Sequence, residues 1–219
     1  MKTIFKTVLL IGVLIIGITA VSGINDILNK GNIVSQELKK NEIESYKTTH
    51  FKDDKVFIRV HPEISDGSTL TKYVNQRTAT LKYLSNTHGD TIVDAVITFN
   101  DKYPIEAYRS FMNSYGLEEL SYMYNSYPEG MGVLSNETPT KLIKQTEENI
   151  GRNYTDFKLI DKIVSVKTRI HAKDLLRIQS DKRVFLVDAG PEDVYRENSN
   201  KEIRTTIDYI YPVYIKFGR

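Results

Sequence analysis

The sequence predicts an α+β fold: a ferredoxin-like split βαβ sheet with helices on one face, extended by additional N- and C-terminal strands. Three observations lead to this prediction. Segments of alternating or β-branched apolar residues recur between residues 55 and 217 and indicate strands. Segments with apolar residues at three- and four-residue steps lie between several of them and indicate helices. Between residues 91 and 188 the predicted order is β-α-β-(α)-β-α-β.

Before this domain, residues 7–24 form an apolar run without a charge, and they follow Lys2 and Lys6. Such a run is at the lower limit for a transmembrane helix and near the upper limit for a signal peptide. In both cases the lysines stay in the cytoplasm and the remaining chain is exported. We expect a signal-anchor helix over residues 1–24 that partners the lipid bilayer. The localisation would then be the cell membrane, single-pass with the C-terminal domain outside, or secreted if cleavage occurs near Ser22.

Composition limits the classes of partner. The chain has no cysteine, which excludes a disulfide-stapled domain and a lipid anchor on cysteine. Its 30 basic and 28 acidic residues are interleaved without a basic block, so we expect no nucleic-acid partner. Another envelope protein is the partner expected for an exported domain of this kind.

The polar segment 25–50 has only a weak helical pattern, which predicts a partly helical stalk ahead of an extracytoplasmic domain at 51–219. Within that domain residues 55–61 alternate and predict a strand that ends at Pro62. Residues 78–84 place alternate apolar side chains on one face and predict a second strand.

The clearest pattern begins with a β-branched strand at 91–99. Pro104 stands in the first turn of the helix that follows, and Gly116 ends this helix. A strand at 117–124 and a glycine-containing loop at 125–137 come next.

The later elements are predicted in the same way. They are helices at 138–151 and 171–180 and strands at 160–170, 184–187 and 203–217. The last strand alternates over its whole length, so one of its faces should be buried. Pro212 cannot donate to a sheet, which puts this strand at an edge or gives it a bulge.

The sequence contains no motif that predicts a catalytic residue, a cofactor-binding residue or a metal site. The histidines are far apart and show no metal-ligand spacing: His50, His61, His88 and His171. No serine stands in a nucleophile elbow, and the glycines of residues 127–132 lack the context of a phosphate loop.

Three aspartates lie on or beside predicted strands: Asp94, Asp161 and Asp188. Buried there, they could be acids with tuned pKa values. The interpretation favoured by the pattern is that they point to the solvent side of a half-buried sheet.

Tyrosines are dense around the strand at 117–124. The cluster consists of Tyr115, Tyr122, Tyr124 and Tyr127. Packing of helix and sheet explains such a cluster, and it is also a candidate partner surface because exposed tyrosines are enriched at interfaces.

Two motifs carry a resemblance to a known family. They are DAVITFNDKYPIEAYRSFM, a strand leading into a helix, and IVSVKTRIHAKDLLRIQSDKRVFLVDAG, a strand, a short Leu-rich helix and a closing strand. With the helix TPTKLIKQTEENIG between them, residues 56–188 resemble the extracytoplasmic C-terminal domain of bacterial sigma-factor regulators. Those regulators also carry a cytoplasmic segment that binds sigma, for which residues 1–6 are too short. The element order is also similar to propeptide or inhibitor domains of subtilisin-like proteases, although the helix at 138–151 and the long last strand depart from it.

These observations together predict a membrane-tethered extracytoplasmic binding or sensing domain, non-enzymatic and accessory to envelope or sigma-factor signalling. The alternative is a protease inhibitor or propeptide-like module, which would offer a sheet edge and the tail at 209–219 to a protease cleft.

Overall fold

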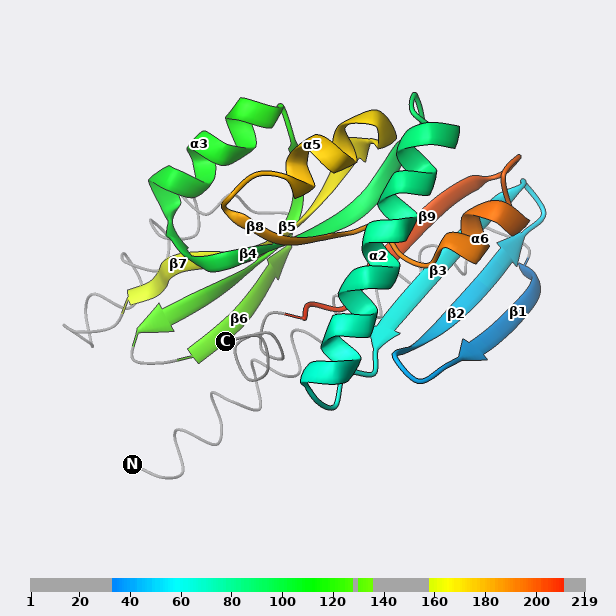
Figure 1. Ribbon diagram of the computed structural model, residues 1–219, viewed down its shortest axis with the longest axis horizontal. Coiled ribbons are helices and arrows are strands. Elements are labelled where there is room, and N and C mark those ends of the chain that lie inside the picture. Colours follow the sequence, from blue (N-terminus) through cyan, green and yellow to red (C-terminus); the bar gives the residue numbers. More distant parts are fainter. Residues whose placement is uncertain (1–32, 128–129, 136–157, 211–219) are drawn as a thin grey trace.

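The computed structural model describes residues 33–127, 130–135 and 158–210, which form a mixed α/β structure with two sheets (Figure 1). The first sheet has the order β1-β2-β3-β9, with β1 (Ile33–Lys40), β2 (Glu44–Phe51), β3 (Lys55–Pro62) and β9 (Glu202–Ile207). The second has the order β6-β5-β7-β4-β8, with β6 (Gly130–Ser135), β5 (Glu118–Tyr127), β7 (Lys158–His171), β4 (Ile92–Pro104) and β8 (Val184–Asp188). The helices are α2 (Gly67–Thr87), α3 (Ile105–Tyr115), η1 (Ala172–Asp174), α5 (Leu175–Gln179) and α6 (Glu192–Glu197).

The helices lie on the same side of both sheets in Figure 1. The helices α3 and α5 cover the five-stranded sheet, α6 covers the four-stranded sheet, and α2 runs across the region where the sheets meet. Alternate residues of β4, among them Val93, Ile97 and Phe99, face the main core, where they pack with α2, α3 and α5. Val96 points to the other face and joins a smaller core with β3 and Ile207 of β9.

The helix after β4 forms as predicted. Pro104 is the N-cap of α3, and Gly116 ends the helix with a φ of 62°. This left-handed conformation costs glycine little, because it has no Cβ. The strands expected at 91–99, 117–124, 160–170 and 184–187 are observed as β4, β5, β7 and β8, and the short helix expected at 171–180 as η1 and α5.

The strand predicted at 78–84 is wrong, because these residues belong to α2. This helix begins with a capping box in which Asp66 accepts from the Thr69 N–H and the Thr69 side chain accepts from the Asp66 N–H. Over its full length the buried residues Leu70, Tyr73, Leu81 and Leu84 follow a helical period. A window of seven residues is too short to distinguish the two-residue period of a strand from the 3.6-residue period of a helix.

The expected stalk at 25–50 contains two strands where the structure describes it, since β1 and β2 fall within residues 33–51. Tyr46 and Thr48 of β2 are buried, so this part of the chain belongs to the folded domain. With β3 and β9 these strands make a separate sheet, whereas we expected the strands at 55–61 and 203–217 to extend the ferredoxin-like sheet. A further strand, β6, lies within the expected loop at 125–137.

The expected lipid-bilayer partner and single-pass localisation require correction. Among the described residues, no helix is long and apolar enough to cross a membrane. The longest described helix, α2, is amphipathic and carries Lys72, Arg77 and Lys82. The predicted signal-anchor helix at 1–24, the helix at 138–151 and Pro212 lie outside the described residues.

Candidate functional site

The two sheets are joined side by side at β4 and β9. The Asp94 side chain on β4 accepts a hydrogen bond from the backbone N–H of Thr205 on β9, at 3.0 Å between Oδ2 and N. Val96 and Ile207 pack together in the core beneath this junction. A polar link and an apolar contact therefore fix the position of one sheet against the other.

A pocket of about 350 Å³ opens at this junction, and we call it the seam pocket. One wall is the end of α2 and the start of β4, with Leu84 and Val93. The opposite wall is the segment from α6 into β9, which contributes Ile203 among others. Its volume falls within the range of about 300–1,000 Å³ that is usual for small-molecule sites.

Five side chains of alternating charge cross the pocket region, and we call them the charge ladder: Glu118, Arg169, Asp94, Arg204 and Glu202. Strand register builds its first half, because Arg169 on β7 is the direct cross-strand neighbour of both Glu118 and Asp94. The nitrogen–oxygen distances along the ladder are 3.2, 3.5, 3.8 and 2.9 Å. All members except Asp94 line the pocket.

The arginines of the ladder keep donors available. Arg169 uses Nη1 for Glu118, and its Nε is buried at 3.5 Å from Asp94 without a hydrogen bond. Arg204 donates through Nε to Glu202, and its Nη1 is 3.8 Å from Asp94. Within the described part of the chain, the Nη2 groups of both arginines have no partner. Lys201, also in the pocket wall, has no side-chain partner there either.

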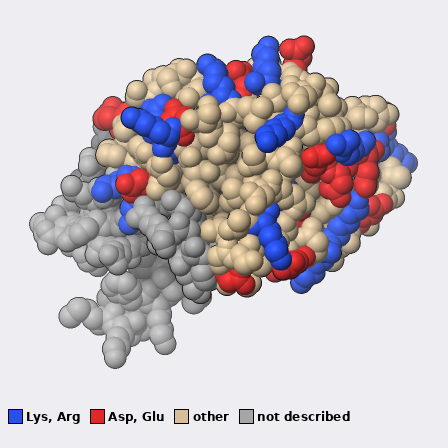
Figure 2. All heavy atoms as spheres, in the orientation of Figure 1, with Lys and Arg blue, Asp and Glu red and all other residues tan. Residues whose placement is uncertain are grey.

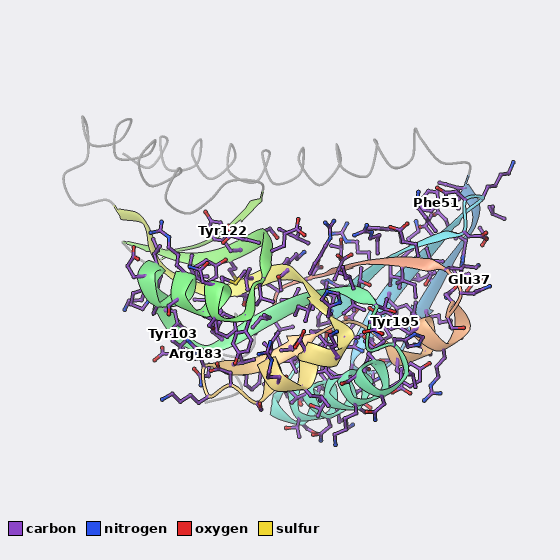
Figure 3. All side chains as sticks on the ribbon, turned by 90° about the horizontal axis from the view of Figure 1, so that it is seen from above. Glu37, Phe51, Tyr103, Tyr122, Arg183 and Tyr195 are labelled. Carbon is purple, nitrogen blue, oxygen red and sulfur yellow. The ribbon has the colours of Figure 1, made fainter. Side chains whose placement is uncertain are left out.

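Apolar and aromatic groups complete the site. Tyr195 of α6 is buried and donates its hydroxyl to the Ala189 carbonyl at 2.7 Å. Burial raises the pKa of the Tyr195 hydroxyl, which therefore stays protonated. In Figure 3 Tyr195, on α6, is well separated from Tyr122 on β5. At the rim Ile92 leaves 54% of its surface exposed. The pocket thus combines fixed charges with apolar surface.

A second polar group is buried between α2 and the sheets. Arg77 is fully buried and forms ion pairs with Glu44 of β2 and Asp188 of β8. The Tyr73 hydroxyl donates a hydrogen bond to the Asp188 carboxylate. The Gly190 N–H donates to the same carboxylate, at 2.9 Å. The Arg77 guanidinium also stacks 4.6 Å from the Tyr73 ring centroid. These residues do not line the seam pocket and their charges pair with one another, so we regard this group as structural.

The tyrosines of the predicted partner surface are separated by the fold. Tyr122 is completely buried in the main core, so it cannot contribute to an exposed surface. Tyr115 is partly exposed and donates its hydroxyl to Asp181 at 2.8 Å. The side chains of Tyr124 and Tyr127 lie outside the described residues.

The three aspartates singled out in the sequence also have different surroundings. Asp188 is buried, with 2% exposed, against the solvent-facing orientation favoured by the pattern. Asp94 leaves only 12% of its side chain exposed and holds the middle of the charge ladder. Asp161 lies outside the described side chains. Among the described residues, no three His, Asp or Glu side chains come together as metal ligands.

Sequence patterns missed Arg169, Arg204, Glu118 and Glu202 as site residues. Each is a charged residue on a strand, and such residues are usually solvated. Alternation does place Arg169 and Asp94 on the polar faces of their strands, but only the pairing register shows that they meet.

On the face shown in Figure 2, Lys and Arg side chains are interspersed with Asp and Glu. Comparison with protein-family models, with curated proteins and with solved structures finds no match for this chain.

Proposed function

We propose that this chain is a non-enzymatic binding or sensing domain that takes a small ligand in the seam pocket. The observation that carries the proposal is the pocket of about 350 Å³ at the junction of the two sheets, with apolar walls and charged groups of both signs. Its charged groups pair with each other along a ladder, which suits recognition, and the ladder holds no nucleophile beside a base of the kind that nucleophilic catalysis needs. A ligand there contacts both sheets, so its binding would tighten their junction.

We further propose that β4-α3-β5-β7-α5-β8 is a ferredoxin-like split βαβ unit. Support comes from the strand order β5-β7-β4-β8, in which each crossover helix connects strands separated by one neighbour. The same segment carries the resemblance to sigma-factor regulators, so signalling is the cellular context that we propose for the binding domain.

The test is a small-molecule screen on the full-length protein, read by amide chemical shifts of the residues around the pocket. The variant Ser199→Trp fills the pocket, since Ser199 lines it and is exposed. The variant Ser68→Trp adds the same side chain at an exposed position of α2 away from the pocket. Compounds that bind the wild type and Ser68→Trp but not Ser199→Trp support the proposal. If no compound shifts the pocket residues, the proposal is wrong.

The alternative, a protease inhibitor or propeptide-like module, has one observation in its favour. Among the described strands, β1 pairs with β2 alone, and it exposes Val34 and Leu38. An open edge of eight residues can add a strand from a partner. The proposed tail at 209–219 fits less well at its start, because Ile210 is 2% exposed and Tyr209 hydrogen-bonds to Ser121.

Inhibition assays separate this alternative from the binding domain. The full-length chain is titrated into a subtilisin-like protease, as wild type and as Leu38→Asp. The alternative is favoured if the wild type inhibits the protease and Leu38→Asp does not. Equal absence of inhibition in both would remove it.

A further inference from the structure

We propose that the ligand of the seam pocket is an organic carboxylate with an apolar body, held through its carboxylate by Arg169 and Arg204. This inference rests on the proposed function and adds the chemical class of the ligand. It combines three features of the pocket: which hydrogen-bonding groups are still available, how its charges balance, and where its apolar surface lies.

The available hydrogen-bonding groups are mostly donors. Two guanidinium Nη2 groups, of Arg169 and Arg204, have no partner among the described residues, and the Lys201 ammonium is equally without one. Carboxylate oxygens are acceptors only, and charge-assisted bonds from arginine to carboxylate are among the strongest in proteins. Because Asp94 lies 3.5 and 3.8 Å from the two arginines, its own contacts leave them free to turn toward a ligand.

The carboxylates of the ladder are less available to a cation. Glu118 and Glu202 each accept from an arginine, and Asp94 accepts the Thr205 N–H as well as contacting both arginines. An ammonium ligand would therefore have to displace arginines that are already in place. The three carboxylates are balanced by two arginines and Lys201, so the site has no excess positive charge with which to hold a polyanion such as a phosphate ester.

Apolar surface lies close to these donors. Ile203 lines the pocket and is partly exposed, and Ile92 is half-exposed at its rim, whereas Leu84 and Val93, which also line it, are already buried. A short hydrocarbon chain on the carboxylate would cover the exposed parts of Ile92 and Ile203 and remove that surface from water. An inorganic anion would leave them exposed and gain only the polar contacts.

The probe for the experiment is hexanoate, titrated into the full-length protein and followed by amide shifts of pocket residues. We expect a Kd on the order of 1 mM, as is usual for a ligand of this size. Arg169→Gln and Arg204→Gln should each weaken binding by about 10- to 100-fold, because each removes a charge-assisted hydrogen bond. Arg59→Gln makes the same change at an exposed position of β3 outside the pocket and should leave binding unchanged.

Glu202→Gln should change the affinity for hexanoate in the opposite direction. It removes a negative charge from the pocket wall and frees the Arg204 Nε, so hexanoate should bind about two- to fivefold more tightly. A purely structural role of the ladder would make the arginine and glutamate variants weaken binding alike. Thermal unfolding of each variant shows whether the fold is retained.

Two further probes separate this inference from the proposed function. If hexylammonium or hexanol shifts the pocket residues and hexanoate does not, the pocket binds ligands but the carboxylate class is wrong. If none of the three does and the wider screen is also negative at the pocket, the proposed function fails with the inference. If inorganic phosphate binds as tightly as hexanoate, the apolar side chains of the pocket contribute nothing to the affinity, and that part of the inference is wrong.

Discussion

The guanidinium of Arg77 on α2 lies 3.1 Å from the carboxylate of Asp188 on β8, and both side chains are almost entirely removed from solvent. The same arginine pairs with Glu44 on β2, so one buried cation joins a helix to a strand of each sheet. Burial lowers the pKa of Arg77, and the charge of Asp188 opposes this shift.

Replacing this arginine tests how much the buried group holds the sheets together. Arg77→Met leaves two buried carboxylates without a cation, and we expect a loss of about 3–5 kcal/mol in the free energy of unfolding. Urea denaturation measures it. Arg177→Met is the matched control, because its ion pair with Asp174 is exposed and should contribute no more than about 1 kcal/mol.

The charges of the buried group should be strongly coupled. If unpaired carboxylates cause the damage, the triple variant Glu44→Gln, Arg77→Met, Asp188→Asn should be more stable than Arg77→Met alone. A triple variant whose free energy of unfolding equals the sum of the single losses would show that the three side chains act independently.

Asp94 should hold the two sheets together at their junction. Asp94→Ala removes the acceptor of the Thr205 N–H. It also leaves Arg169 and Arg204 without the carboxylate between them. We expect a loss of about 1–3 kcal/mol in the free energy of unfolding and faster hydrogen exchange at the Thr205 amide. Asp90→Ala, whose side chain is 99% exposed, should change neither quantity. Unchanged exchange in Asp94→Ala would contradict this role.

Asp181 should contribute a pH-dependent part of the stability. Hydrogen bonds from Arg183, with a further one from Tyr115, hold the pKa of its carboxyl well below the ordinary value. A carboxyl with a lowered pKa in the folded state stabilises above its unfolded pKa, and this stabilisation is lost as the pH falls through the folded pKa.

The wild type should therefore lose stability from about pH 4 downward, and Asp181→Asn should lose less over the same window. The measurement is the free energy of unfolding by urea between pH 2 and pH 7 for both proteins. Parallel curves for the two would show that Asp181 does not titrate differently in the folded state.

Gly116 should be required for its backbone conformation alone. Its φ is 62°, and a Cβ placed there meets nothing within 4 Å. Gly116→Ala should cost about 1–2 kcal/mol through left-handed strain, and Gly116→Asn less, because asparagine tolerates this region better. Thermal unfolding measures both, with Gly89→Ala as a control at a glycine without a positive φ. Equal melting temperatures for all of them would contradict the strain argument.

Local chemistry explains why β4, α3 and β7 could be predicted. A β-branched run, a proline in the first turn and a glycine at the C-terminus each act within a few residues. The prediction failed where a short window fits two periods, as at 78–84 in α2, and where polar strands such as β1 carry no alternation because both of their faces are exposed. Likewise, the buried Tyr122 and the partly exposed Tyr115 look alike in sequence and differ only in the packing around them.

The sequence by itself determined the mixed α/β class and most elements between β4 and β8, because propensity, periodicity and turn chemistry are local. Only the tertiary structure decided that β1, β2, β3 and β9 form their own sheet and that Asp94 meets Thr205, 111 residues further along the chain. Strand register then placed Arg169 between Glu118 and Asp94, and the meeting of the sheets enclosed the seam pocket. Such contacts depend on the packing free energy of the whole core, which no short segment of the chain contains.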